Sequence, residues 1–521
     1  MNDSGKSSFY TVATTLLVVL AIACLVKPAS IIAADRPNIL FIYTDDQSYK
    51  TLSCYGDHPD WVQTPNIDAL ARRGVRFERA YLGAWCMPSR ASILTGRLQH
   101  GVETMRMEGQ YPRSVYDPSV CRFVPSEFRR QGYHTAQIGK WHTGIDTGYG
   151  RDWDYQIVWN RPGHPENAGN YFKNQILTFN GEDRQVGGYS TDNYTEWALE
   201  YIRGDHRDAN KPWYLWLCYG AVHGPTTPAA RHEGTLKGNK PIVPDDIVGP
   251  WPGKPKYLAK TAAWQKDSDG TPRMKPKEID AKSNFNVNEV GKSFEDWIQQ
   301  MNECNMAIDE GVGRLVAALK ETGQYENTLI VYAADQGYGL GEHGFNQKVA
   351  PYDATVASPL IIAQPNQVPE AVVRKEAINA TDIVNYMCKR GDVQIPWKMH
   401  GRDISSLVQN TATDWDQPMI MTHTGRSYGE YTDRIPTDER LTIVGNVPWY
   451  VLLRSGQYKY IMNLTAGEME ELYDLGSDPE ELTNLAADVG QSDRLQQLRQ
   501  QAMEELERTD AKFVEHLPLG D

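Results

Sequence analysis

One cysteine, Cys86, stands where the sequence could place a reactive group at the start of a helix. It opens the segment Cys86-Met87-Pro88-Ser89-Arg90, which an apolar run typical of a helix follows. Backbone N–H groups and the helix dipole at such a position favour anions, and they would lower the pKa of a bare thiol. The alternative is an ordinary helix start with a buried structural cysteine.

Polar residues follow four short apolar runs, at residues 38–43, 135–138, 213–219 and 328–334. Apolar continuity is typical of buried strands, and ligands of open α/β sheets lie beyond the carboxyl ends of such strands. We therefore expect these polar side chains to meet at one edge of a sheet. They are Asp45 and Asp46 after the first run, Lys140 and His142 after the second, His223 after the third, and Asp335 and Gln336 after the fourth.

Four of these side chains, Asp45, Asp46, Asp335 and Gln336, offer hard oxygen donors. Such donors suit Ca²⁺ or Mg²⁺ and are poor ligands for zinc. Taken alone, acidic pairs at strand ends are commonly helix caps or solvated turns. In the same way Lys140 could be a surface side chain, and a histidine at a strand end, such as His223, is often structural.

Three segments resemble the sulfatase family. Residues 86–96 meet every fixed position of the family motif Cys-x-Pro-Ser-Arg-x-x-x-Leu-Thr-Gly. Residues 132–142 match a second motif that ends in Gly-Lys-Trp-His. Residues 341–344 read Gly-Glu-His-Gly and are followed by Lys348, as in many members of the family. The resemblance extends from Asp45 to about Pro479.

The resemblance implies a role for each matched residue. Cys86 would be oxidised to formylglycine (3-oxoalanine), whose hydrated aldehyde is the nucleophile, and Arg90 would hold it. Lys140 and Lys348 would bind the sulfate group, His223 or Lys348 would protonate the departing alcohol, and His142 would take a proton so that sulfate leaves by elimination. The metal, Ca²⁺ with Mg²⁺ as the alternative, would be held by Asp45, Asp46, Asp335, Gln336 and residue 86 itself. Gln336 departs from the asparagine that is usual in the family, and His343 would either brace its loop or touch substrate.

The function implied by the resemblance is hydrolysis of sulfate monoesters, with sulfated carbohydrates as the expected substrates. A formylglycine-generating enzyme or an anaerobic sulfatase-maturating enzyme would be a partner during maturation. One alternative is a phosphonate or phosphodiester hydrolase that uses the same nucleophile. The other is an inactive carbohydrate-binding homologue in which Cys86 stays a thiol.

The alternation of strand and helix patterns predicts an α/β fold with a large mixed, mostly parallel sheet flanked by helices. By resemblance it would be similar to alkaline phosphatase, over residues 35–400. We expect helices near 66–73, 124–131, 191–203 and 294–322, and an irregular insertion at 224–283 that either shapes the substrate pocket or covers the surface. Residues 401–521 are predicted to form a smaller α+β subdomain with a hairpin at 450–462 and a terminal helix from about 492. Around the insertion, Trp251, Trp264 and Trp297 would either stack on sugar rings or pack in the interior.

Composition limits the partners and the compartment. The 521-residue chain has a net charge of −14, which argues against nucleic acid as a partner. The apolar run 12–26, followed by small residues, predicts a signal peptide over residues 1–34, and hence a periplasmic or secreted protein; a retained membrane anchor is the alternative. The seven cysteines contain no Cys-x-x-Cys pair, so we do not expect a disulfide scaffold.

Overall fold

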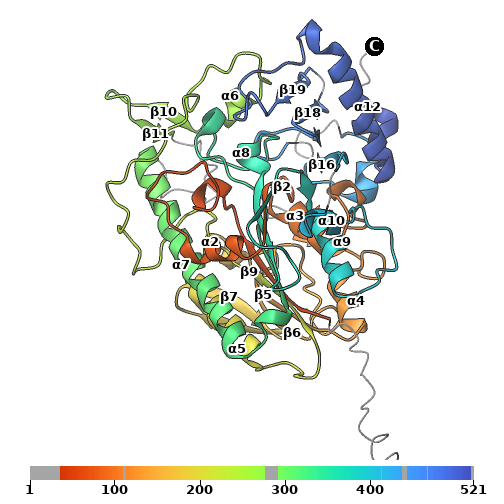
Figure 1. Ribbon diagram of the computed structural model, residues 1–521. Helices are drawn as coiled ribbons and strands as arrows, with labels where there is room; N and C mark the ends of the chain where they lie inside the picture. The colour runs from red at the N-terminus through yellow and green to blue at the C-terminus, as the bar shows by residue number, and fades with distance from the viewer. Residues whose placement is uncertain are drawn as a thin grey trace, which may run out of the picture. The chain divides into compact units, whose positions relative to one another are not determined.

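A mixed β-sheet runs through the middle of the protein, with helices on both of its faces (Figure 1). The computed structural model describes residues 36–108, 113–275, 292–411, 414–436, 443–465 and 467–517. The chain divides into two units, residues 1–36 and 37–521. The predicted signal peptide, residues 1–34, lies outside the described residues. Within the described part, no helix has the length and apolar character needed to cross a bilayer.

The sheet confirms the predicted mixed, mostly parallel arrangement. Its order is β14-β2-β13-β12-β1-β9-β5-β6-β7-β8, and β15 pairs with β2. The five consecutive strands β12, β1, β9, β5 and β6 are parallel to one another. The strands are β1 (Asn38–Thr44), β2 (Val75–Tyr81), β5 (His134–Lys140), β6 (Tyr155–Trp159), β7 (Gln175–Phe179), β8 (Glu182–Val186), β9 (Trp213–Cys218), β12 (Thr328–Ala334), β13 (Ser358–Ala363), β14 (Val372–Arg374) and β15 (Ile378–Asn379).

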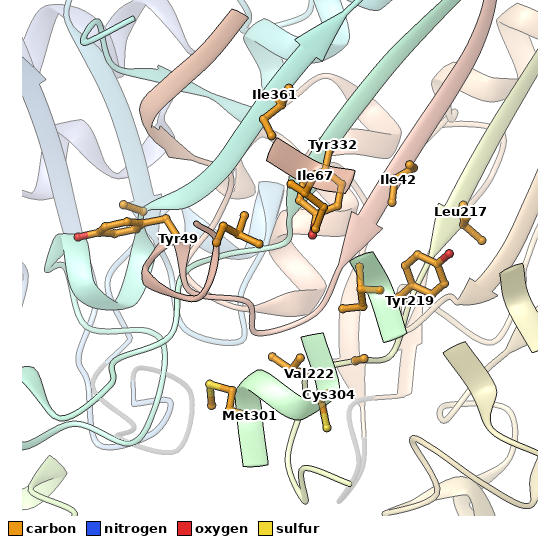
Figure 2. Packing of buried hydrophobic residues seen from close by; sticks show 14 of the residues in the cluster. Ile42, Tyr49, Ile67, Leu217, Tyr219, Val222, Met301, Cys304, Tyr332 and Ile361 are labelled. Atoms are coloured by element: carbon orange, nitrogen blue, oxygen red, sulfur yellow. The ribbon is translucent and has the colours of Figure 1, made fainter. Parts of the chain in front are cut away.

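Strand β1 shows why this sheet is buried on both faces. Its apolar residues alternate between two cores, with Leu40 and Ile42 on one face and Ile39, Phe41 and Tyr43 on the other. Figure 2 shows Ile361, Tyr332, Ile42 and Leu217 of the first core on the neighbouring strands β13, β12, β1 and β9, with Ile67 of α2 beside Tyr332. The first core takes in α2 (Pro65–Arg72), α5 (Ser190–Arg203) and α7 (Phe294–Glu321), and the second takes in α3 (Cys86–Thr95), α4 (Val124–Arg130) and α9 (Ala380–Arg390).

The last quarter of the chain forms the predicted smaller α+β part. Its antiparallel sheet has the order β16-β17-β18-β19, and helix α12 packs on one face through Leu495, Leu498 and Leu506. The hairpin turn is tighter than expected, because β17 continues to Ser455 and leaves two residues before β18. The bounds are β16 (Met419–His423), β17 (Tyr450–Ser455), β18 (Tyr458–Asn463), β19 (Glu471–Asp474) and α12 (Ser492–Arg508).

Within the predicted insertion, the described residues 224–275 are largely irregular but are tied to the core. Trp264 and Trp297 are 0% and 1% exposed, so they pack in the interior and do not offer a surface for sugar rings. The half-buried Trp251 donates its indole N–H to the backbone oxygen of Asp246 at 2.8 Å. The remaining strands form two antiparallel pairs, β3–β4 (Arg106–Glu108, Arg113–Val115) and, in the insertion, β10–β11 (Trp264–Lys266, Pro272–Met274). The remaining α-helices are short: α6 (Leu258–Thr261) in the insertion, α8 (Asp353–Val356) and α10 (Ser405–Val408).

Candidate active site

The structure brings the polar ends of four adjacent strands together at one edge of the sheet. The backbone N–H of Asp45, directly after β1, donates to the oxygen of Ala221 beyond β9 at 2.9 Å. On the other side of β1, the N–H of Asp335 donates to the oxygen of Thr44 at 3.0 Å. These backbone bonds hold the residues that follow β1, β9 and β12 at fixed positions relative to one another.

Cys86 is the first residue of α3 and lies directly against the acidic side chains. Its sulfur is 3.3 Å from Asp45 Oδ1 and 3.9 Å from Asp46 Oδ1. Lys348 Nζ lies 2.9 Å from the same sulfur. The residue is 1% exposed, so solvent barely reaches the thiol in the folded protein.

Residues of the Cys86 segment also have a structural role, which is separate from any chemistry. The Ser89 hydroxyl lies 2.6 Å from the hydroxyl of Tyr43 in β1 and also donates to the backbone oxygen of Asp335. Gly96 ends the helix with a φ of 69°, a left-handed conformation that suits glycine. The segment therefore anchors the start of α3 to the ends of β1 and β12.

The expectation of a lowered thiol pKa is wrong. Burial raises the pKa of Cys86, and the nearby carboxylates of Asp335 and Asp45 raise it further. Lys140 and Lys348 act in the opposite direction but do not compensate. The helix start alone could not reveal this, because the carboxylates come from other strands.

Arg90 lies inside the site and is fully buried. It donates to the backbone oxygen of Lys140 at 3.0 Å and to Asp335 Oδ2 at 3.1 Å. Its guanidinium is also 3.7 Å from Asp45 Oδ2. Arg90 therefore joins the ends of β5, β1 and β12 as a fixed positive charge beside the Cys86 helix.

Two lysines each pair with one of the adjacent aspartates. Lys140 Nζ donates to Asp45 Oδ2, and Lys348 Nζ lies 2.5 Å from Asp46 Oδ1. Burial opposes the charge of both lysines, but Asp45 beside Lys140 and Asp46 beside Lys348 raise their pKa values overall. Both ammonium groups are therefore held in the charged form.

The two aspartates have opposite pKa shifts. Burial acts against the charge of Asp45, but Lys140, His223 and Arg90 together hold its pKa well below the usual range. For Asp46, burial and the charges of Asp45 and Asp335 outweigh Lys348 and raise the pKa to about 7. Burial and Asp45 also raise the pKa of Asp335, so three carboxylates share a small buried volume in which two of them are poorly neutralised.

The donors of this cluster fit a divalent cation. Oxygen, sulfur and nitrogen atoms of Asp45, Asp46, Cys86 and His223 all lie within 4.8 Å of one another. The amide nitrogen of Gln336 donates to Asp46, while its buried Oε1 has no hydrogen-bond partner among the described residues. An orphaned amide oxygen beside grouped carboxylates is the arrangement that a hard cation would complete.

The two predicted histidines differ in their contacts. His223 Nε2 is 3.6 Å from Asp46 Oδ2, and burial with Lys348 lowers the pKa of its ring. His142 is 5% exposed, with a buried Nδ1 that lacks a partner among the described residues. Burial and Lys140 hold the pKa of His142 well below its usual value, so its ring is neutral.

Two further residues, His343 and Tyr171, make contacts with the insertion and with the site. The backbone N–H of His343 donates to Asp246 Oδ2 at 2.9 Å, so this buried histidine braces the insertion. Tyr171, which the sequence analysis did not identify, stacks on His223. It lies in an irregular stretch before β7, where no periodicity or motif marks it.

Comparison with known proteins decides the family. The sequence profile of the Sulfatase family matches residues 37–390, and that of the N-sulphoglucosamine sulphohydrolase C-terminal region matches residues 341–510. The chain belongs to the sulfatase family. The sulfatase profile spans more than half of the chain and contains all the site residues named above.

Two relatives of this sulfatase match over nearly their whole lengths. It is 27% identical over 551 residues to an N-acetylglucosamine-6-O-sulfatase of Bacteroides thetaiotaomicron, with 97% of this chain and 92% of the relative covered. It is 25% identical to an arylsulfatase of Clostridium perfringens, with 92% and 96% covered. The protein is thus a sulfatase.

Solved structures share the fold of this sulfatase. One, in complex with its substrate D-glucosamine-2-N,6-O-disulfate, has a TM-score of 0.75 and 24% identity, with 91% of this chain and 98% of that chain covered. The phosphonate monoester hydrolase of Agrobacterium radiobacter has a TM-score of 0.66 and 20% identity, with 91% and 96% covered. At these identities the likeness concerns the fold alone.

Proposed function

We propose that this sulfatase hydrolyses sulfate monoesters of sulfated amino sugars, with Cys86 converted to formylglycine and with Ca²⁺ in the cluster. The observation that carries the proposal is the contact of Cys86 with Asp45, Asp46 and Lys348 in one buried site. The substrate class is supported by the relative named as an N-acetylglucosamine-6-O-sulfatase and by the structural neighbour bound to a glucosamine disulfate.

The metal would be held by the carboxylates of Asp45, Asp46 and Asp335 and by Gln336 Oε1, with residue 86 as a further ligand. When bound, a divalent cation draws negative charge from a sulfate oxygen and lowers the pKa of a hydroxyl that it contacts. The all-oxygen protein donors favour Ca²⁺ or Mg²⁺. We propose Ca²⁺, and Gln336 in place of the family's asparagine keeps the amide oxygen that either ion uses.

The chain's own cations bind the charged end of the substrate. Lys140 and Lys348, both held protonated, would contact sulfate oxygens. Arg90 would orient residue 86 from the interior of the protein, away from the substrate. A hydrated aldehyde at that position supplies a hydroxyl nucleophile and a route of sulfate release that a serine would lack. Because these groups are fixed by backbone and carboxylate contacts, they need little rearrangement as charge develops on the sulfuryl oxygens.

The reaction needs two proton transfers, one to the departing alcohol and one from the nucleophile. Lys348 and His223 keep 17% and 15% exposure, whereas Lys140 and Arg90 are fully buried. The departing alcohol must face the open side, where the ammonium of Lys348, or His223 in its doubly protonated form, would donate the proton, because the neutral His223 ring keeps its proton on Nδ1 toward Gly224. His142, neutral and with a free Nδ1, accepts a proton from the nucleophile side.

A substrate panel tests the proposal. We expect turnover of 6-O-sulfated N-acetylglucosamine and of glucosamine-2-N,6-O-disulfate to exceed that of 3-O- and 4-O-sulfated isomers, with sulfate release measured by ion chromatography. The Cys86→Ala variant, purified in parallel, is the control for contaminating hydrolases. Equal rates on all isomers would contradict the proposed substrate class.

Two further measurements separate the alternatives. Higher kcat/KM on a phosphonate monoester or phosphodiester than on every sulfate ester would favour the phosphonate hydrolase. The mass of the tryptic peptide that contains residue 86, from protein made in its native host, should be about 18 Da below that of the thiol form. An unmodified thiol in active protein would contradict the role of formylglycine. Cleavage at the predicted signal peptide, proposed here with export to the periplasm or medium, is read from the mature N-terminus.

A further inference from the structure

Tyr171 lies against the exposed side of the active-site cluster and contacts two of its proposed substrate-binding residues. Its ring stacks on the ring of His223 with centroids 4.0 Å apart and planes inclined by 5°. Lys140 Nζ lies 5.1 Å from the centre of the same ring. Tyr171 itself is fully buried, so the stack is a fixed feature of the site and not a surface contact.

The position of Tyr171 is set by its own backbone and by neighbours outside the site. Its backbone oxygen accepts hydrogen bonds from Ser190 Oγ at 2.7 Å and from Gln175 Nε2 at 3.0 Å. Its hydroxyl accepts from Arg161 Nη1 at 3.3 Å. A Cβ added at Gly220, three residues before His223, would come within 3.3 Å of this backbone oxygen, so a glycine permits the close approach. The ring is thus held independently of His223.

His223 needs such a support. Its Nδ1 lies 2.6 Å from the backbone oxygen of Gly224, an interaction that leaves Nε2 as the atom facing Asp46. The side chain is at the open edge of the cluster, where a rotation about its side-chain torsions would carry Nε2 out of the site. A flat ring on one face removes that freedom, and stacked aromatic pairs stabilise such an arrangement beyond simple burial.

We propose that Tyr171 is a positioning residue that holds the His223 ring so that Nε2 faces the reacting ester, a role that rests on the proposed function of His223. Tyr171 exchanges no proton and touches no substrate. Removal of its ring should therefore act on turnover through His223 and not through Lys140 or the fold.

The test is a double-mutant cycle of Tyr171→Leu and His223→Ala, with kcat/KM measured on the best sulfated sugar and on 4-nitrophenyl sulfate. Tyr171→Leu alone should lower kcat/KM about tenfold to hundredfold, the size expected for a displaced catalytic group. In the His223→Ala background the same change should alter kcat/KM less than about twofold. Tyr171→Phe, which keeps the ring, should recover most of the lost activity.

A second Tyr–His stack, at the start of β6, provides a matched control. Tyr155 stacks on the exposed His206 with centroids 4.7 Å apart and planes inclined by 6°, in a pair that has no contact with the site. Tyr155→Leu should lower the thermal midpoint of unfolding without changing kcat/KM. It measures what the loss of a Tyr–His stack does to the fold alone.

Independent, multiplicative effects of Tyr171→Leu and His223→Ala would overturn the inference, since Tyr171 would then act elsewhere. Tyr171→Met, which has similar volume and no ring, replaces the leucine variant if that protein does not fold. If neither variant folds, the role of Tyr171 lies in the core and the inference is wrong. Failure of the wild-type protein on sulfated sugars would overturn the proposed substrate alone, because the cycle can still be read with 4-nitrophenyl sulfate.

Discussion

The protein contains two buried clusters of charged residues, which differ in how completely their charges are paired. The active-site cluster holds Asp45, Asp46, Asp335, Arg90, Lys140 and Lys348. The second cluster, between α8 and the C-terminal sheet, holds Asp353, Glu481, Arg79, Arg454 and Lys459. Asp353 is 2.8 Å from Lys459, 3.2 Å from Arg79 and 3.6 Å from Arg454.

The difference shows in the pKa values of the central aspartates. Burial acts against the charge of Asp353, but Lys459, Arg454 and Arg79 together hold its pKa below the usual range. Burial and neighbouring carboxylates instead raise the pKa of Asp46 to about 7. In the second cluster the central carboxylate is fully paired, although burial and Asp353 raise the pKa of the neighbouring Glu481, and the cluster stabilises the contact between α8 and the C-terminal sheet. In the active-site cluster three carboxylates face three cations, but Asp46 stays poorly neutralised and Gln336 Oε1 has no partner among the described residues, so the cluster keeps oxygen atoms that a cation could bind.

The largest expected effect comes from the nucleophile position. Cys86→Ala should lower kcat by about 10⁴ or more, because the remaining groups bind sulfate without a nucleophile. The midpoint of urea unfolding should stay within experimental error, since one buried sulfur is lost from a site that is not tightly paired. Residual activity above about 1% would mean that residue 86 is not the nucleophile.

The two central aspartates should respond in opposite ways to loss of charge. Asp353→Asn leaves Glu481 as the remaining carboxylate beside three cations and should cost about 3–5 kcal/mol of unfolding free energy, with kcat of the folded protein unchanged. Asp46→Asn should abolish turnover and cost less than about 1 kcal/mol in metal-free protein, because the carboxylate it removes is already poorly neutralised. Urea unfolding and sulfate release measure both quantities. Similar stability losses in the two variants would remove the distinction between the clusters.

Acid should weaken the packing of His100 against the C-terminal sheet. Burial lowers the pKa of His100, which lies 2.9 Å from Thr422 Oγ1 of β16, to about 4. The unfolded chain takes up this proton near pH 6.5, so the stability contributed by neutral His100 is present above that pH. It is lost as the pH falls from about 6.5 to about 4, by about 3 kcal/mol in total.

The control for this pH dependence is His100→Gln, which keeps a neutral donor and acceptor at the position. The free energy of unfolding of the variant should vary less between pH 7 and pH 4.5 than that of the wild type. Identical pH profiles for the two proteins would show that His100 is not the group responsible.

The smallest effect concerns the metal itself. Ca²⁺ at about 100 times its dissociation constant should raise the unfolding free energy of chelator-treated protein by about 2.7 kcal/mol. Isothermal calorimetry with Ca²⁺ and then Mg²⁺ identifies the preferred ion, and Gln336→Ala should weaken binding while Gln336→Asn restores part of it. A variant that binds Ca²⁺ as tightly as the wild type would exclude Gln336 as a ligand.

The sequence predicted that Asp45, Asp46, Lys140 and Asp335 meet at one sheet edge, because they follow or end continuous apolar strands whose carboxyl ends meet by topology; Arg90 and Lys348 came only from the family resemblance. It also predicted that α3 begins at Cys86, but not the raised pKa of its thiol, which depends on carboxylates that follow β1 and β12. The second cluster could not be predicted, since Arg454 and Lys459 face each other in the hairpin β17–β18 whereas Arg79 lies on β2 of the large sheet, and no motif links the two sheets. Tyr171 was missed for a similar reason, because its role depends on a stack with a residue 52 positions later.

The pairing of β1 with β12 sets an order of events during synthesis. Residue 335, which completes the edge around the cysteine, is made about 250 residues after Cys86. At about 5–20 residues per second, that interval is roughly 10–50 seconds. For this time the thiol lies in an unfinished chain, where the proposed modifying enzyme would reach it. Once β12 has joined the sheet, the same atom is enclosed, so the proposed conversion would have to come first.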